Sequence, residues 1–430
     1  MPSGSDLPSP EMPHDRGIPR AAPGPGRRLR VLFLASYFPR PRIPLTGTWA
    51  LEQAKSLSAV TDLEVVCCTP WVPVILRAVP KARPWIDVPT VHQWGNVLAR
   101  YYKALYYPIP PFNAWAFPDP SRQMALAWHS VRARLLRTID RFQPDVLYCH
   151  HTAVNGYYAS RIHSHTGLPY VITDHDFDEL AQCERLPERR AFFEPILGHA
   201  YRHLCVSRRM EQDVRRIFPF AATETLHNGI NLLSVPPQDE RPPGLRDKLV
   251  IFSAGMFAAC KGLPLLVAAF AQVAGRYPRA VLRIAGDGND RLTIEGAIRS
   301  HKVQDQVLLL GRIPHPEVIR EMAWCDIFAL VSWNESFGIV YVEAMAAGKP
   351  IIACTDSGIA DVVEDGTQGC LVEPKNVAAA AAALDRLLRS EQDRQRMGDN
   401  ARSLVHERLT WNMNTQRLLQ IFNACLAARL

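Results

Sequence analysis

Short apolar segments alternate with helix-like segments through both halves of the chain, and this alternation strongly limits the folds available to it. In the first half the apolar runs are 29–36, 62–67, 145–149, 170–173 and 203–206. In the second half they are 249–254, 281–285, 307–310, 327–331 and 351–354. Runs of this length are typical of buried strands in a parallel sheet. The pattern predicts an α/β protein with two Rossmann-like, doubly wound domains that face each other across a cleft.

Proline-rich segments set the predicted domain boundaries in this chain of 430 residues. Residues 236–244 contain four prolines and mixed charges, which predicts a linker. It separates an N-terminal domain, 29–235, from a C-terminal domain, 245–410. The first 28 residues carry seven prolines and four glycines, so we expect 1–28 to be a disordered tail. The segment 411–430 contains apolar periodicity and predicts a final helix.

The charge of the chain is mildly basic, with 49 Lys and Arg residues, 42 Asp and Glu residues and a net charge of +7. The basic residues occur only in short runs, such as Arg27-Arg28 and Arg208-Arg209. A nucleic-acid-binding protein usually concentrates its charge in denser runs, so we expect no nucleic-acid partner. Anionic small molecules or acidic lipid fit this balance better.

Cysteines and apolar runs indicate the compartment. The ten cysteines are scattered without CxxC spacing, which argues against a disulfide framework and a zinc site and is typical of a reducing cytosol. No run of about 18 apolar residues occurs, so we expect no segment that spans a bilayer. The sequence predicts a cytoplasmic protein, soluble or peripheral on the inner face of the cell membrane.

The segment 334–343 follows a predicted strand and begins a predicted helix. Backbone N–H groups at a helix start, unobstructed at Gly338, form an anion site suited to a diphosphate. Glu335 lies in the loop and Glu343 in the helix, about 12 Å apart if all eight steps are helical, so they would touch different parts of one long ligand. The spacing alone leaves a second interpretation open, in which Glu335 caps the helix and Glu343 faces solvent.

Several motifs resemble the retaining, GT-B-fold glycosyltransferases of family 4 (group 1), beginning with Glu335 and Glu343 as their E-x7-E pair. Further matches follow in family order: Gly255…Lys261-Gly262, Gly286-Asp287-Gly288, Gly311-Arg312-Ile313, 343–350 and Ser357-Gly358-Ile359. The stretch 36–54 is similar to the family's first strand, glycine loop and first helix, and the resemblance implies that the final helix, 411–430, crosses back to the N-terminal domain. It is most similar to the branch that makes bacterial cell-surface polysaccharides of the teichuronic-acid type.

The resemblance implies a role for each matching residue. Glu335 would hold hydroxyls of the transferred sugar, His175 would contact another of its hydroxyls, and Lys261 would neutralise the leaving diphosphate. Glu343 would accept hydrogen bonds from the ribose. The donor-binding residues would be Gly47, Gly255, Lys261, Ile313, Ser336, Phe337, Gly338, Ile339, Val340 and Glu343. Taken without the family, Gly47 can be a turn residue, His175 a structural histidine and Lys261 a solvated lysine.

Two positions depart from the family pattern. The family often has arginine where this chain has Met256, so the diphosphate loses one expected cation. Either Lys261 and the helix amides suffice, or another arginine such as Arg312 reaches in, or the activity is weakened. Asp176 replaces the glycine of the family's Thr-x-His-Gly segment, which here reads Thr173-Asp174-His175-Asp176.

The resemblance implies transfer of a hexose, with retention, from a UDP- or GDP-sugar to a glycan or lipid-linked acceptor in surface polysaccharide biosynthesis. It implies no cofactor besides the nucleotide sugar and no metal, and His150-His151 lacks a carboxylate at the spacing of a metal site. Two alternatives remain open. One is a non-catalytic nucleotide-sugar-binding protein, and the other is a GT-B-like phosphorylase or epimerase.

Residues 71–128 are rich in aromatic and basic side chains, and two interpretations remain open. These side chains could stack on an acceptor sugar or lie at an anionic membrane surface. They could equally be core aromatics among solvated cations. The residues are Trp71, Arg77, Lys81, Trp85, Trp94, Arg100, Tyr101, Tyr102, Lys103, Tyr106, Tyr107, Trp115 and Trp128.

Overall fold

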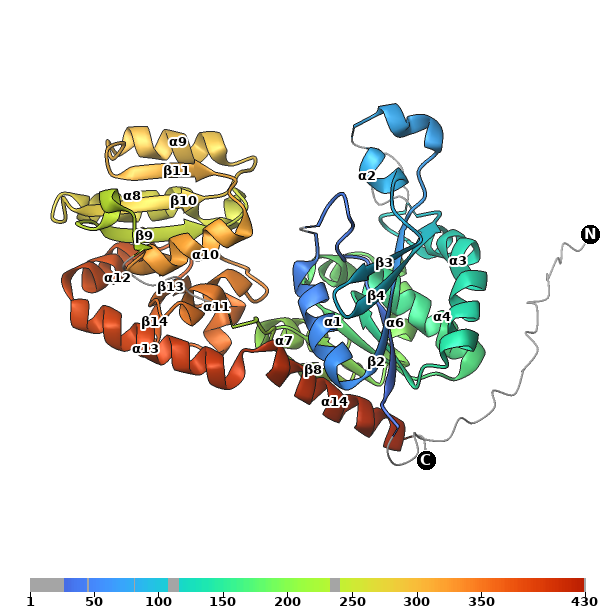
Figure 1. Ribbon diagram of the computed structural model, residues 1–430. Helices are drawn as coiled ribbons and strands as arrows, with labels where there is room; N and C mark the ends of the chain where they lie inside the picture. Colours follow the sequence, from blue (N-terminus) through green and yellow to red (C-terminus); the bar gives the residue numbers. More distant parts are fainter. Residues whose placement is uncertain (1–26, 45, 81, 107–115, 233–239, 429–430) are drawn as a thin grey trace, which may run out of the picture.

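The computed structural model shows two α/β domains, each built on its own parallel sheet, which confirms the predicted fold class (Figure 1). It describes residues 27–44, 46–80, 82–106, 116–232 and 240–428. Most of the predicted tail and the first part of the predicted linker lie outside these residues. So do Lys81, Tyr107 and Trp115 of the aromatic and basic segment.

The N-terminal sheet has eight strands in the order β3-β4-β2-β1-β5-β6-β7-β8. They are β1 (Arg30–Leu34), β2 (Asp62–Pro70), β3 (Val91–Trp94), β4 (Val97–Ala104), β5 (Val146–His150), β6 (Tyr170–Asp174), β7 (Arg202–Cys205) and β8 (Thr223–Thr225). All neighbours pair in parallel except β3 and β4. The strand order runs outward in both directions from β1 and β5. Their carboxyl ends therefore flank a switch point, where sheets of this kind bind ligands.

Three of these strands, β3, β4 and β8, have no counterpart among the predicted apolar runs. Exposed and half-buried residues alternate along β3, and buried and half-buried ones alternate through most of β4. A strand with only one buried face does not form a continuous apolar run. β8 is a three-residue edge strand of Thr-Glu-Thr, too short and polar to be recognised from its sequence.

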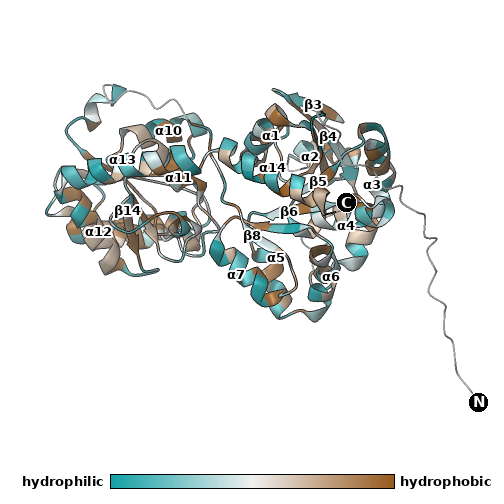
Figure 2. Cartoon of the chain, turned by 90° about the horizontal axis from the view of Figure 1, so that it is seen from below, coloured by the Kyte–Doolittle hydropathy of each residue, from teal (hydrophilic) through white to brown (hydrophobic). Residues whose placement is uncertain are grey.

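Helices surround this sheet. They are α1 (Thr48–Val60), α2 (Arg83–Ile86), α3 (Ser121–Phe142), α4 (Tyr157–Thr166), α5 (Asp178–Ala181), α6 (Pro187–Gly198) and α7 (Arg208–Ile217). The longest, α3, buries Met124, Trp128, Val131, Leu135 and Ile139 along one side. This spacing of three or four residues produces the apolar stripe that holds an amphipathic helix on a sheet. Helix α7 is largely hydrophilic and lies at the junction of the two domains (Figure 2).

The C-terminal sheet has six parallel strands in the order β11-β10-β9-β12-β13-β14. They are β9 (Leu249–Ala254), β10 (Ala280–Ala285), β11 (Val307–Gly311), β12 (Ile327–Ala329), β13 (Ile351–Cys354) and β14 (Gly369–Val372). The predicted run 327–331 is a strand only as far as Ala329, and a loop follows it. In that loop the Leu330 carbonyl oxygen accepts a hydrogen bond from the Tyr341 hydroxyl at 2.7 Å. β14 was not among the predicted runs.

The helices of the C-terminal domain are α8 (Leu263–Ala274), α9 (Arg291–Ser300), α10 (His315–Trp324), α11 (Ile339–Ala346), α12 (Val377–Arg389) and α13 (Glu391–Arg408). Asn376 caps α12, because its side-chain oxygen accepts from the Ala379 N–H at 2.9 Å. Pro264 lies in the first turn of α8, where a missing N–H has no cost.

The last helix, α14 (Trp411–Ala427), crosses back to the N-terminal domain, where it lies beside α1 (Figure 1). Its Leu418 and Phe422 are buried in the apolar cluster of that domain. The amide of Gln53 donates to the Asn414 side-chain oxygen at 2.7 Å, in a buried contact. This helix therefore links the C-terminal domain to the sheet of the N-terminal one.

Candidate active site

A cavity of about 610 Å³ opens between the two domains. Its lining comes from both: Thr48, Trp49, Glu52, Gly229, Ile230, Asn231, Ile313, His315, Val318, Ile339, Val340, Glu343 and Trp411. Four residues that the sequence predicts to bind the donor are among them, namely Ile313, Ile339, Val340 and Glu343. The first turn of α11 thus faces a space that the opposite domain closes.

The start of α11 depends on glycine at its N-cap. Gly338 has φ of 86°, in the left-handed region, and a Cβ there would come within 2.5 Å of the Tyr341 ring. No side chain caps the helix. The Tyr341 N–H donates to the Gly338 carbonyl oxygen at 3.0 Å, so the N–H groups of Ile339 and Val340 are the ones that can face an anion, and the helix dipole favours one.

Glu335 lies in the loop before α11 and is largely buried, with 17% of its side chain exposed. Its carboxylate forms an ion pair with the Lys261 ammonium and accepts from the Ser332 hydroxyl at 3.1 Å. Gly262 permits the close packing of this corner, since a Cβ there would lie 2.4 Å from the Val331 carbonyl oxygen. Glu335 therefore does not cap the helix, and Lys261 is not a freely solvated lysine.

Glu343 lies inside the cavity, with only 14% of its side chain exposed, so the solvent-facing alternative is wrong. One of its carboxylate oxygens lies 2.7 Å from His315 Nε2. This hydrogen bond, with the charge of Glu343 as a smaller cause, raises the pKa of His315 above 6.5. At pH values below this raised pKa, the His315 ring is protonated and faces the Glu343 carboxylate.

Replacing Glu343 with glutamine is expected to return the pKa of His315 toward 6.5, because the charged acceptor is lost. The stability that this pair contributes is present below the unfolded-state pKa and is lost as the pH rises through the folded-state value. An NMR titration of the His315 ring measures the change. Glu317→Gln, on the same helix and paired with Arg320, is the control and should leave the titration unchanged.

His175 lies at the carboxyl end of β6, next to the switch point. Its Nε2 is 3.2 Å from His150 Nδ1, and its ring lies 5.9 Å from that of Trp49. Burial, and then the charge of His151, lower its pKa to about 3, so the ring is neutral at physiological pH. A neutral imidazole can exchange hydrogen bonds with a sugar hydroxyl but supplies no positive charge. His175 itself does not line the cavity, whereas its neighbour Trp49 does.

Glu335 lines a second cavity, of about 210 Å³. It is lined by Phe177, Asp178, Ala181, Ser207, Arg209, Met210, Asp213, Asn334, Glu335 and Ser336. The predicted pair Glu335 and Ser336 therefore faces the N-terminal domain here. The segment directly after His175 provides part of the opposite wall.

The remaining predicted residues have different surroundings. Gly47 has φ of 69°, and a Cβ there would lie 2.2 Å from the Tyr37 carbonyl oxygen, so the turn itself requires glycine. Gly255 directly follows β9, and a Cβ on it would meet no other atom within 4 Å. The Phe337 ring is buried and stacks on His227, with ring centroids 5.4 Å apart, so only its backbone can face a donor. Met256 is 66% exposed and adds no charge.

Sequence reasoning missed several residues that line the cleft. Trp49, Glu52, Asn231, His315 and Trp411 come from four separate segments, and none of them is among the predicted site residues. The Asn231 amide donates to the Glu52 carboxylate. Only the neighbouring Gly311-Arg312-Ile313 match could have drawn attention to His315.

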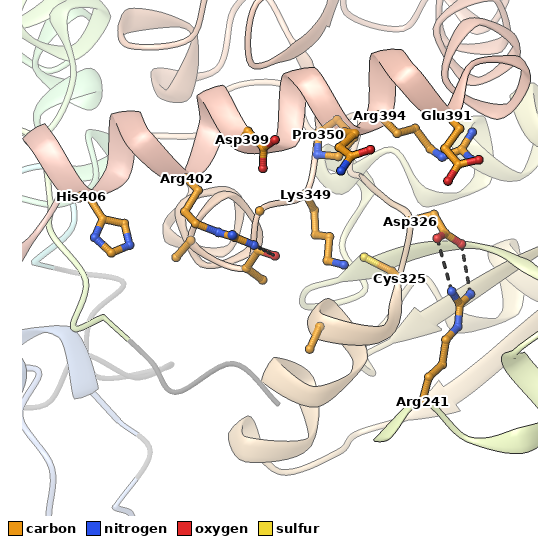
Figure 3. A pocket seen from close by; sticks show the side chains of 15 residues that line it. Arg241, Cys325, Asp326, Lys349, Pro350, Glu391, Arg394, Asp399, Arg402 and His406 are labelled. Carbon is orange, nitrogen blue, oxygen red and sulfur yellow. Dashed lines mark hydrogen bonds and ion pairs between the residues drawn. The ribbon is translucent and has the colours of Figure 1, made fainter. Parts of the chain in front are cut away.

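A larger cavity, of about 800 Å³, lies beneath α13 and away from these residues (Figure 3). Its polar side chains include Lys349, Arg394, Asp399 and Arg402. None of the predicted site residues lines it. Size alone therefore does not identify the functional cleft.

Across the described ranges, no group of three or more His, Cys, Asp or Glu side chains is arranged to hold a metal ion. No helix within those ranges has the length and apolar character needed to cross a bilayer.

Comparison with known proteins agrees with this geometry. Residues 46–232 match the family model Glycosyltransferase Family 4, and residues 237–404 match Glycosyl transferases group 1. The chain is 24% identical over 400 residues to the putative teichuronic acid biosynthesis glycosyltransferase TuaC of Bacillus subtilis, covering 91% of this chain and 97% of that one.

Solved structures share the fold. The sucrose-phosphate synthase of Thermosynechococcus elongatus superposes with a TM-score of 0.74 at 21% identity, covering 93% of this chain and all of that one (100%). Anabaena HepE in complex with UDP superposes with a TM-score of 0.70 at 17% identity, covering 92% and 100%. The two family matches together extend over most of the chain, and the protein is a glycosyltransferase with the GT-B fold.

Proposed function

We propose that the protein is a retaining hexosyltransferase that uses a UDP- or GDP-sugar and glycosylates a glycan or a lipid-linked acceptor in surface polysaccharide biosynthesis. The observation that carries this proposal is the Glu335–Lys261 pair, which lies beside the uncapped start of α11. An anion site, a cation and a carboxylate in one corner suit a sugar diphosphate. The name of TuaC and the UDP of the HepE structure support the acceptor and donor classes.

The proposed step is attack on the same face as the leaving group. The acceptor oxygen bonds to the anomeric carbon as the bond from that carbon to the diphosphate oxygen breaks. The hydroxyl proton passes to the leaving diphosphate. Lys261 and the α11 amides stabilise the charge that develops there, so this step needs no metal. Glu335 holds sugar hydroxyls, Glu343 with His315 holds the ribose, and the closed cleft excludes water.

Calorimetry with UDP, GDP and ADP tests the donor site. A nucleotide that binds the folded protein gives a measurable binding signal and raises the stability of the fold. NMR of the product formed from the matching sugar nucleotide and an acceptor then reads the anomeric configuration. Binding of UDP or GDP and a retained configuration are expected. Inversion, or turnover without an acceptor to an epimer, would refute the proposal. Binding without turnover on any acceptor would favour the non-catalytic alternative that Met256 suggests.

The proposal includes contact with an anionic membrane on the cytoplasmic side, and one exposed segment supports it. The aromatic side chains of 71–128 are mostly not exposed, and Tyr101, Tyr102 and Trp128 are buried. Among the described residues of this segment, Trp71 and the aliphatic side chains of 74–79 form a run of exposed apolar residues, with Ile75 88% exposed, while Val91, Phe117 and Leu126 are exposed at separate places. Figure 1 shows this segment projecting beside α2. Exposed aliphatic side chains next to arginines suit an acidic lipid surface.

Replacing Ile75 with aspartate is expected to weaken binding to vesicles that contain an anionic lipid by about tenfold, because one inserted apolar side chain is lost and a repelled charge is added. Vesicle flotation measures the bound fraction. Leu308→Asp is the matched control, since Leu308 is 50% exposed on β11 of the other domain. Equal flotation of both variants, or none by the unaltered protein, would contradict membrane contact at this segment.

A further inference from the structure

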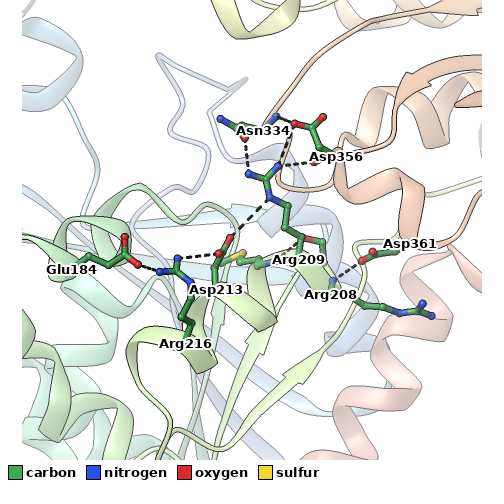
Figure 4. Close-up of polar contacts among 10 residues, drawn as sticks. Glu184, Arg208, Arg209, Asp213, Arg216, Asn334, Asp356 and Asp361 are labelled. Atoms are coloured by element: carbon green, nitrogen blue, oxygen red, sulfur yellow. Dashed lines mark hydrogen bonds and ion pairs between the residues drawn. The ribbon is translucent and has the colours of Figure 1, made fainter. Parts of the chain in front are cut away.

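Arg209 spans the junction between the two domains. It lies in the first turn of α7, which Ser207 caps by accepting from the Met210 N–H. Its guanidinium donates through Nη1 to the Asp356 carbonyl oxygen at 2.6 Å and through Nη2 to the Asn334 side-chain oxygen at 2.5 Å (Figure 4). Both partners belong to the C-terminal domain, so one side chain joins α7 to two of its loops.

Asn334 directly precedes Glu335 and has an unusual backbone. Its φ is 58°, in the left-handed region, which asparagine tolerates better than most residues other than glycine but still occupies at a cost. Such a conformation costs free energy and persists only where the surroundings hold it. Here the Asn334 N–H contacts the Asp356 carboxylate at 3.4 Å, and the side chain is held by Arg209. The conformation of the Glu335 loop thus depends partly on a residue of the opposite domain.

The second loop that Arg209 contacts also shapes the position of Glu335. The Gly358 N–H donates to the Glu335 carbonyl oxygen at 2.9 Å. A Cβ on Gly358 would lie 2.1 Å from the Ser336 carbonyl oxygen, so the two loops pack backbone against backbone. Arg209 therefore holds two loops. It binds the Asp356 carbonyl in the loop that packs against Glu335 and Ser336, and it binds the side chain of Asn334 in the Glu335 loop itself.

We propose that Arg209 is a positioning residue that couples closure of the two domains to the placement of Glu335. With the domains apart, the guanidinium leaves both loops, and the strained Asn334 loses its side-chain partner. The planar guanidinium reaches two acceptors at once, which a lysine ammonium at the end of a flexible chain does not reproduce. The functional part of this inference rests on the proposed sugar transfer, but the structural part does not.

The experiment compares Arg209→Lys with Arg216→Lys by hydrogen exchange of the segment 332–338 in the full chain. Arg216 is a matched control on the same helix, because it pairs with Glu184 and Asp213 inside its own domain. Loss of a charged hydrogen bond is expected to speed exchange in the Arg209 variant by about tenfold. The control should exchange like the unaltered protein. Unchanged exchange in Arg209→Lys would overturn the proposal.

Kinetics supply the second readout, with UDP-glucose or GDP-mannose as the probe. We expect the Arg209 variant to lose about tenfold in kcat with little change in the donor KM, since the donor-binding residues are intact. An equal loss of kcat in Arg216→Lys would show a merely structural effect and overturn the proposal. If the unaltered protein turns over no nucleotide sugar, the proposed function fails, while the exchange comparison still decides the role of Arg209.

Discussion

Glutamine in place of Glu335 is expected to lower kcat by about a hundredfold to a thousandfold, the range seen when one pre-placed electrostatic group is removed. The substitution keeps the shape of the side chain and a hydrogen-bond acceptor for Ser332. It removes the charge that pairs with Lys261 and that would hold the hydroxyls of the transferred sugar. Steady-state kinetics with the nucleotide sugar found by calorimetry measure the loss.

Glu343→Ala is the comparison that separates the two carboxylates. Glu343 lies along the cavity wall with His315 and away from the Lys261 corner. Its loss should raise the donor KM by about tenfold and change kcat much less, because ground-state and transition-state binding are weakened alike. The opposite ranking of the two variants would contradict the roles assigned to Glu335 and Glu343. Equal unfolding temperatures would exclude misfolding as the cause.

Alanine in place of Asp174 is expected to lower the free energy of unfolding by about 3–5 kcal/mol, the cost of breaking a buried polar pair. The Asp174 carboxylate is buried at the end of β6 and accepts three hydrogen bonds. These come from His203 Nε2 at 2.8 Å, the Thr152 N–H at 2.7 Å and the Thr152 hydroxyl at 2.6 Å. Its removal would leave these donors buried without an acceptor. Urea unfolding at neutral pH measures the loss.

At acidic pH, the difference in the free energy of unfolding between the unaltered protein and Asp174→Ala should become smaller. Burial opposes ionisation of Asp174, but the hydrogen bond and charge of His203, with smaller contributions from His151 and Thr152, lower its pKa below 3.8. A carboxylate of lowered pKa contributes stability above its unfolded-state pKa, and this is lost as the pH falls through the folded-state value. Asp176→Ala is the control, since that side chain is 47% exposed, and it should change stability by less than about 0.5 kcal/mol. Equal losses of stability in Asp174→Ala and Asp176→Ala would refute this account of Asp174.

Much of the fold was predictable because parallel strands buried on both faces must be apolar throughout. The runs 249–254 and 351–354 coincide with β9 and β13 for this reason. The same rule explains the failure at β3 and β8, whose residues are partly exposed. Part of the candidate site was predictable too, because Gly338 and the start of the following helix expose backbone N–H groups through local backbone geometry alone.

The sequence by itself determined two α/β domains, the helix that starts after Gly338, and the residue types able to bind a sugar diphosphate. These properties depend on local periodicity and on backbone conformation within a few residues. The tertiary structure alone decided which groups meet. Lys261 pairs with Glu335 across 74 positions of the chain, and Arg209 reaches Asn334 across 125. Contacts of that kind depend on how strands order in a sheet and how two domains close, because packing and not chain proximity brings those atoms together.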